Sequence, residues 1–291
     1  MNRVLFLSTI LVFLMVFGCD QSNQIAPTFS EGQDPSSADQ TWKLVPSLSD
    51  EFNDPDLDTS KWYNTVPGGW IGRPPGLFKA NTVSMADGKL LVTTDQLPEP
   101  EIIDEKEFTH AGAHIQSKLT ANVGLYFECS MKANKTFMSS TFWLINDWKS
   151  FEGCDNRVTE LDIQEAVGYI NTEKEFAQTF NEKMNSNTHS RLVTCEDSVG
   201  IVGNKAKMEG KVYDDFHVFG AWWKSPREIL FFLDGNHVGT VEPVADFDLP
   251  MHIKLVIETY NWNPTPEDGG MNMSAEDRTT YYDWVRVWEL E

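Results

Sequence analysis

The stretch Thr159-Glu-Leu-Asp-Ile-Gln-Glu-Ala-Val-Gly168 places three carboxylates within six residues of an otherwise apolar segment. In a regular β-strand, Glu160 and Asp162 would share one face, while Leu161 and Ile163 would share the other. Glu165 would then fall on the apolar face. One extra residue in a β-bulge at Ile163-Gln164 returns Glu165 to the face of Glu160. We therefore predict a bulged strand with one acidic and one apolar face.

Short alternating or apolar runs surround this strand and are separated by Gly, Pro, Asn and Asp. Their lengths and their β-branched and aromatic content are typical of strands, and Asp234-Gly235 is a hairpin signal. Apart from a possible turn near Thr172–Phe176, helical periodicity is hard to find. We therefore predict an all-β jelly-roll sandwich of two antiparallel sheets. The predicted strands are Leu90–Thr94, His114–Leu119, Gly124–Met131, Thr141–Ile145, Glu160–Ala166, His217–Trp223, Ile229–Leu233, Ile253–Glu258 and Tyr281–Glu289.

The chain has 291 residues and a formal net charge of -21. This charge argues against nucleic acid as a partner, because binding phosphates requires clustered Lys and Arg. It does not argue against a polysaccharide: a neutral one ignores the net charge, and a few local cations can hold a sulfated one. We find no internal repeat or linker composition after residue 42, so we expect one catalytic domain over residues 41–291, acting as a monomer.

The N-terminus indicates export. Arg3 precedes an apolar run that is too short to span a bilayer comfortably and ends at Gly18-Cys19. The end of this run resembles a bacterial lipobox, although Phe17 stands where a small residue is usual. We expect residues 1–19 to be a lipoprotein signal peptide and Cys19 to carry a lipid that anchors the protein to a bacterial membrane, with an ordinary signal peptide as the alternative. The polar composition of residues 20–40 predicts a flexible tether.

Three cysteines remain in the exported domain. Cys129 lies in an alternating strand, so we predict a buried free thiol. Cys154 and Cys195 lie in polar, loop-like segments and could form a disulfide after export, or remain unpaired. Their spacing is not that of a metal site.

The three carboxylates suit glycosidic bond hydrolysis. A retaining mechanism needs one ionised carboxylate to attack the anomeric carbon and one protonated carboxyl to donate to the leaving oxygen. Crowding of like charges raises the pKa of one member, and Asp162 between the glutamates can tune the nucleophile. The alternatives are a solvated acidic edge strand and a calcium site. A calcium loop would place its ligands among Gly and Asn rather than on a strand.

Three motifs resemble glycoside hydrolase family 16, which has a β-jelly-roll fold. Glu160-Leu-Asp-Ile-Gln-Glu165 is similar to its E-x-D-x-x-E signature. Asp50-Glu-Phe-Asn53 followed by Trp62 resembles its N-terminal opening, and Tyr282-Asp-Trp-Val-Arg-Val287 its closing strand. The resemblance covers residues 42–291.

The resemblance implies roles for individual residues. Glu160 would be the nucleophile, Asp162 its assistant and Glu165 the acid/base. Many members hold a structural calcium near the two chain ends, which would implicate Asp283 here. No cofactor is required for the reaction itself.

Further segments resemble the agarase and porphyranase branch of the family, which cleaves β-1,4 bonds in red-algal galactans. These are Trp70-Ile-Gly-Arg-Pro74, Thr141-Phe-Trp-Leu-Ile145 and Glu258-Thr-Tyr-Asn-Trp262. In the last, Tyr260 and Asn261 replace the agarase-like pattern of acidic and basic residues. The sequence Asp155-Asn-Arg-Val-Thr159 differs from the Gly- and Trp-rich approach usual in laminarinases, which disfavours β-1,3-glucan.

Six residues are candidates for substrate binding. The Trp side chains suit stacking on sugar rings, with core packing as the alternative. Arg73 could grip a sulfate through a bidentate pair, or form a surface salt bridge. His189 lies in a polar, loop-like segment and could bind a sugar hydroxyl or sulfate, or be exposed. The candidates are Trp70, Arg73, Trp143, His189, Glu258 and Trp262.

Within the branch we favour porphyran, because the approach Phe142–Glu165, with its polar insert containing Cys154, looks most like porphyranases. We expect an endo-acting enzyme, since the family usually has an open cleft. The alternatives are a β-agarase and a carbohydrate-binding surface lipoprotein without activity.

Overall fold

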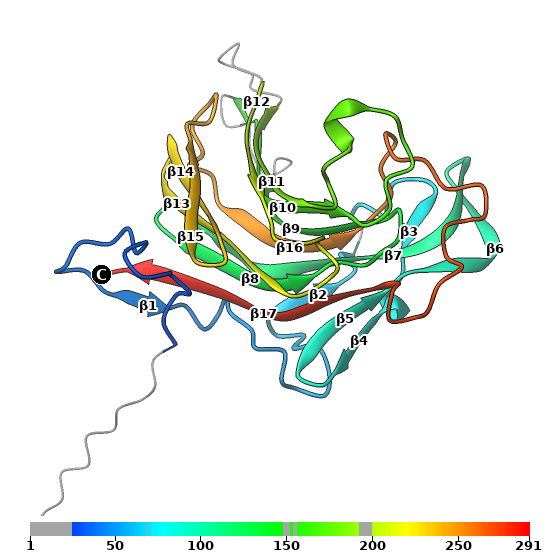
Figure 1. The fold of residues 1–291 in the computed structure, drawn as a ribbon, viewed down its shortest axis with the longest axis horizontal. Coiled ribbons are helices and arrows are strands. Elements are labelled where there is room, and N and C mark those ends of the chain that lie inside the picture. The colour runs from blue at the N-terminus through cyan, green and yellow to red at the C-terminus, as the bar shows by residue number, and fades with distance from the viewer. Residues whose placement is uncertain (1–24, 68, 148–151, 154–155, 192–199) are drawn as a thin grey trace, which may run out of the picture.

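The computed structural model describes residues 25–67, 69–147, 152–153, 156–191 and 200–291. In Figure 1 these residues form two curved sheets stacked on each other, with the strand containing Glu160 in the upper sheet. The predicted all-β sandwich is confirmed. Among the described residues, no helix is long and apolar enough to cross a membrane.

Within the described residues, one sheet has eight strands and the other nine. The eight-stranded sheet has the order β15 (Asn236–Val241), β14 (Glu228–Leu233), β13 (His217–Ser225), β8 (Tyr126–Lys132), β17 (Thr279–Leu290), β5 (Lys89–Thr93) and β4 (Val83–Ala86), and β1 (Trp42–Leu44) also pairs with β17. The nine-stranded sheet has the order β12 (Gly200–Lys207), β11 (Lys183–Arg191), β10 (Val158–Val167), β9 (Ser139–Asn146), β16 (Met251–Ile257), β7 (Lys106–Ala121) and β2 (Trp62–Asn64); β3 (Gly76–Phe78) and β6 (Asp95–Ile103) also pair with β7. In the part of the chain that the structure describes, the short 3-10 turns η1 (Ala80–Thr82) and η4 (Glu175–Ala177) lie outside the sheets.

The main core lies between the sheets, because each sheet turns its apolar side chains toward the other. Leu161 and Ile163 of β10 are fully buried there, together with Phe127 and Cys129 of β8. Cys129 is a buried free thiol, as predicted. The opposite face of β10 is left for the carboxylates.

All nine strands predicted from the sequence are present, and Asp234-Gly235 forms the predicted hairpin between β14 and β15, with positive φ at both residues. The reading of the segment around His189 as a loop is wrong, because residues 183–191 form β11. Ser, Thr and Asn occupy most of the strand, and several of their buried side chains form hydrogen bonds. Thr188 Oγ1, for example, donates to the carbonyl of Val202.

The predicted flexible tether is wrong for residues 25–40. Ile25 and Phe29 pack on an aromatic cluster on the outer face of the eight-stranded sheet, formed by Trp42, Tyr126, Trp222, Phe232 and Trp288. The backbone N–H of Thr28 also donates to the buried carboxylate of Glu128, at 2.9 and 3.1 Å from its two oxygens. The composition of the segment is polar, but its two large apolar residues cover an aromatic surface that would otherwise be exposed.

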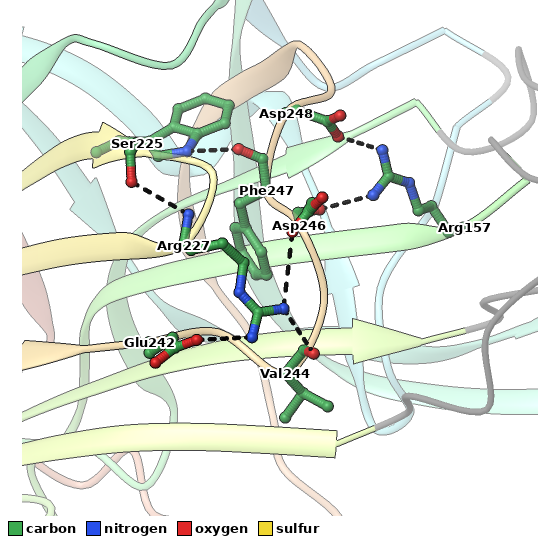
Figure 2. Close-up of polar contacts among 9 residues, drawn as sticks. Arg157, Ser225, Arg227, Glu242, Val244, Asp246, Phe247 and Asp248 are labelled. Carbon is green, nitrogen blue, oxygen red and sulfur yellow. Dashed lines mark hydrogen bonds and ion pairs between the residues drawn. The ribbon is translucent and has the colours of Figure 1, made fainter.

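Two arginines fix the loop that joins β15 to β16 (Figure 2). Arg227, between β13 and β14, donates to Glu242 and to the carbonyl of Val244. Arg157, directly before β10, donates to the carbonyl of Asp246 at 2.7 Å and pairs with Asp248. The start of the carboxylate strand is thus tied to the loop that connects the two sheets.

Candidate active site

A cleft of about 670 Å³ crosses the outer face of the nine-stranded sheet. Strands β7, β16, β9, β10 and β11 form its floor, and the loop before β3 forms a wall. It is lined by Val66, Pro67, Gly69, Trp70, Arg73, His114, Gln116, Thr141, Trp143, Ile145, Asn146, Asp147, Glu160, Asp162, Glu165, Arg191, His252, Lys254, Glu258 and Tyr260.

The predicted bulge brings the three carboxylates to this cleft. Along β9, Asp162 pairs with Trp143 and Gln164 pairs with Phe142, so Ile163 is the extra residue. Glu160, Asp162 and Glu165 all line the cleft as a result, while Ile163 stays in the core. The bulge therefore places Glu160 and Glu165 on the same face of the sheet, as a catalytic carboxylate pair requires.

Glu160 and Asp162 share a polar cluster with two residues of β11. Glu160 pairs with the guanidinium of Arg191. His189 Nε2 lies 2.9 Å from Asp162 Oδ2 and 3.9 Å from Glu160 Oε1. Burial lowers the pKa of His189, so its imidazole is neutral near pH 7.

The buried carboxylates do not all ionise at neutral pH. Burial, followed by the charge of Asp162, raises the pKa of Glu160 to about 7. Burial also raises the pKa of Asp162 well above its ordinary value. The ion pair with Arg191 favours the negative charge on Glu160, so the structure favours an ionised Glu160 beside a protonated Asp162.

Two donors hold Glu165. The hydroxyl of Tyr260 donates to Oε1 at 2.8 Å, and the side-chain amide of Asn187 donates to Oε2 at 2.9 Å. We did not predict either contact from the sequence. The sequence showed Tyr260 only as a departure from the agarase-like pattern of acidic and basic residues. Asn187 carried no signal, because its segment resembles a loop.

The loop before β3 presents Trp70 and Arg73 to the cleft. Arg73 Nε donates to the carboxylate of Glu258 at 2.8 Å, and its guanidinium lies 5.9 Å from the ring centres of both Trp70 and Tyr260. Burial raises the pKa of Glu258 to about 7, while Arg73 opposes that shift. Gly72 has a φ of +129°, and a Cβ there would lie 2.2 Å from the carbonyl oxygen of Gly76, so this turn requires glycine.

Lys254 supplies a further cation to the cleft floor, and it was not predicted. Its Nζ lies 2.9 Å from His114 Nε2 and 5.3 Å from the centre of the Trp143 ring. Burial lowers the pKa of Lys254 to about 8 and that of His114 to about 3. At neutral pH the pair therefore carries the single charge of the lysine.

The remaining residues that the sequence predicted for the site, where the structure describes them, are not among those that line the cleft. His189 contacts Asp162 and is not among the residues that line the cleft. Trp262 stacks on Tyr260 at 4.9 Å and packs against Phe180, outside the lining set. Asp283 lies in β17, 3.6 Å from Lys89 Nζ. Cys19, Cys154 and Cys195 lie outside the described residues.

One group of side chains in the described part of the chain has the composition of a metal site: Glu160, Asp162 and His189 have ligand atoms within 4.8 Å of one another. The positive charge of Arg191 on Glu160 opposes a cation there. Glu160 and Asp162, with His189 beside them, suit acid–base chemistry in the cleft that the two carboxylates line.

Comparison with known proteins agrees with this geometry. The family profile for the β-porphyranase A–D glycoside hydrolase 16 domain matches residues 42–290. The chain belongs to this family. It is therefore a glycoside hydrolase.

Individual porphyranases match this chain over nearly its whole length. β-Porphyranase B of Zobellia galactanivorans is 50% identical over 99% of this chain and 97% of its own. The crystal structure of porphyranase B from that organism matches with a TM-score of 0.89 and 52% identity, covering 91% of this chain and 99% of the other. A β-porphyranase from the gut bacterium Bacteroides plebeius matches with a TM-score of 0.75 and 33% identity, covering 90% and 96%.

Proposed function

We propose that this glycoside hydrolase is a retaining, endo-acting β-porphyranase that cleaves β-1,4 linkages in porphyran, a sulfated red-algal galactan. The observation that carries the proposal is the convergence of Glu160, Asp162 and Glu165 on one cleft in a chain of the β-porphyranase family.

In the first step, ionised Glu160 attacks the anomeric carbon while Glu165 donates its proton to the glycosidic oxygen. The bond between that carbon and the leaving oxygen breaks, and a covalent glycosyl-enzyme forms. In the second step, Glu165 takes a proton from water, whose oxygen attacks the anomeric carbon and releases Glu160. Because Asp162 is protonated, it adds no second negative charge beside the nucleophile.

Cations in the cleft support a sulfated substrate. Arg73, Arg191 and Lys254 line it, although the chain as a whole has a formal net charge of -21. Cations at these positions can bind sulfate esters, while Trp70 and Trp143 offer ring faces for stacking on sugars. The open cleft suits binding within a long chain, and hence endo action.

The N-terminal sequence supports export and lipid attachment at Cys19, which would place the enzyme on a bacterial membrane. We further propose that it acts as a monomer, with a single catalytic domain.

The test is a panel of porphyran, agarose, carrageenan and laminarin, with reducing ends counted and products sized. We expect short oligosaccharides from porphyran early in the reaction, with newly formed ends initially in the β configuration by NMR. Glu160→Gln should lower turnover by at least about 1,000-fold while oligosaccharide binding remains. A higher rate on agarose or laminarin than on porphyran would refute the substrate assignment.

A further inference from the structure

The two oxygens of Glu165 are held by side chains from opposite sides of the cleft floor. Tyr260 follows β16 and donates to Oε1 at 2.8 Å, whereas Asn187 lies on β11 and donates to Oε2 at 2.9 Å. A glutamate side chain has several rotatable bonds, so fixing both oxygens removes most of its freedom.

Packing fixes Tyr260. Its ring is 8% exposed, stacks on Trp262 at an interplanar angle of 18° and lies in a cluster with Val167 and Phe180. Burial raises the pKa of Tyr260 well above its ordinary value, so the phenol keeps its proton throughout the working pH range.

Asn187 is fixed by its neighbours in the sheet. It pairs with Asp162 on β10 and with Gly203 on β12. A Cβ at Gly203 would lie 2.6 Å from Asn187 Oδ1, so glycine there leaves room for the amide. Because Asn187 pairs with Asp162 across the two strands and donates to Glu165, it stands beside two of the three carboxylates.

The two partners differ in chemistry. An amide N–H₂ can only donate, so Asn187 favours Oε2 as a permanent acceptor. A phenol hydroxyl can go on donating to Oε1 when that oxygen carries a proton, because a protonated carboxyl keeps acceptor capacity, and the Oε1 proton then remains available to the substrate. Oε1 can therefore lose and regain a proton without losing Tyr260 as a partner.

We propose that Tyr260 and Asn187 are positioning residues for the acid/base, and that they hold Glu165 in both of its protonation states with the exchangeable proton on Oε1. This inference rests on the proposed function, in which Glu165 alternates between acid and base. In this role, Tyr260 and Asn187 contribute to catalysis by positioning Glu165, without contacting the reacting atoms themselves.

The test uses two substrates that differ in their need for an acid: a porphyran oligosaccharide and a porphyran-oligosaccharide β-glycoside with a dinitrophenyl leaving group. The dinitrophenolate leaves without protonation, and kcat/KM reports only the steps up to glycosyl-enzyme formation. We expect Tyr260→Phe to lower kcat/KM on the natural oligosaccharide by about 10-fold and on the aryl glycoside by less than about 2-fold. Asn187→Ala should show the same contrast.

Tyr126→Phe is a matched control. Tyr126 is also a buried tyrosine that donates to a glutamate, at 2.6 Å from Glu128 Oε1, but it lies in the eight-stranded sheet. Loss of the Tyr126 hydroxyl should lower the melting temperature and leave kcat/KM unchanged on both substrates. If it folds poorly, Tyr282→Phe replaces it, since the hydroxyl of Tyr282 donates to a backbone carbonyl in the core.

The result that would overturn the inference is an equal loss on both substrates, or no loss on either, in Tyr260→Phe and Asn187→Ala. Glu165→Gln separates this failure from failure of the proposed function. If Glu165→Gln loses activity on the natural oligosaccharide and keeps it on the aryl glycoside, Glu165 is the acid, and only the positioning role is rejected. If it shows no such contrast, the acid/base assignment itself is wrong.

Discussion

At the scale of single residues, Asp162 and Arg191 act on Glu160 in opposite directions. Burial raises the pKa of Glu160 to about 7, and a negative charge on Asp162 adds to this shift whenever Asp162 loses its proton, while the charge of Arg191 lowers the pKa. Because Glu160 must be ionised to attack the anomeric carbon in the proposed mechanism, we expect the balance between these neighbours to set the lower pH limit of the reaction.

We therefore expect kcat/KM to fall as the pH drops through about 7, because Glu160 becomes protonated. Arg191→Met should move this acid limb to higher pH, since the positive charge that favours the ionised form is gone. Arg191→Lys, which keeps the charge, should move it less. A limb that stays in place in Arg191→Met would show that another group controls it.

Lys254 carries the clearest prediction on substrate choice. Lys254→Met keeps most of the side-chain volume and removes the charge. It should lower kcat/KM on sulfated porphyran oligosaccharides by about 10-fold and on neutral agarose oligosaccharides by less than about 3-fold. Wild-type affinity for the sulfated oligosaccharide should also weaken above about pH 8, where Lys254 loses its proton.

A suitable control is Lys224→Met, which removes an exposed lysine paired with Glu228 on the other sheet and should leave both rates unchanged. An equal loss on sulfated and neutral substrates in Lys254→Met would instead indicate a role in shaping the cleft floor beneath Trp143.

At the scale of strands, the active site depends on the neighbours of β10. The bulge at Ile163 follows from the pattern of charged and apolar residues, because only an extra residue allows both faces of the strand to be used. The position of β11 does not follow from any such pattern. Apart from Met184, which is buried in the core, its residues Lys183–Arg191 are polar, and side-chain hydrogen bonds such as that from Ser186 to the carbonyl of Ile163 help to hold them in the sheet.

Gly203→Ala tests this arrangement of strands. The added methyl group would lie 2.6 Å from Asn187 Oδ1 and 2.9 Å from the carbonyl oxygen of Ser186, so β11 must shift. We expect kcat/KM on porphyran to fall by about 10-fold as Asn187 moves away from Glu165. Gly200→Ala in the same strand is the control, because its methyl group meets the side chain of Val244. Equal activity in the two variants would contradict the role of Gly203.

At the scale of the whole molecule, the two outer faces of the sandwich differ in function. One outer face carries the cleft, and the other carries an aromatic cluster covered by residues 25–40. Phe29 has ring centroids 4.8 Å from Tyr126 and 5.1 Å from Phe232. The N-terminal segment therefore stabilises the domain from the side opposite the substrate.

Phe29→Ala should lower the free energy of unfolding by about 1–3 kcal/mol, because it uncovers part of this cluster. Denaturant unfolding measures the change, and kcat/KM at low temperature should be unaffected. Phe29→Leu, which keeps an apolar cover, should lose less. Unchanged stability in Phe29→Ala would mean that the segment does not pack on the cluster in solution.

The sequence by itself determined the strand class, the bulge and the identity of the three carboxylates, since these depend on residues adjacent in the chain and on the period of two in a strand. The partners of those carboxylates come from distant segments: Arg191 and Asn187 from β11, and Tyr260 from beyond residue 250. Only the tertiary structure decided these contacts and the packing of residues 25–40. The physical reason is that strand order and sheet stacking, rather than local pattern, determine which polar and aromatic side chains meet.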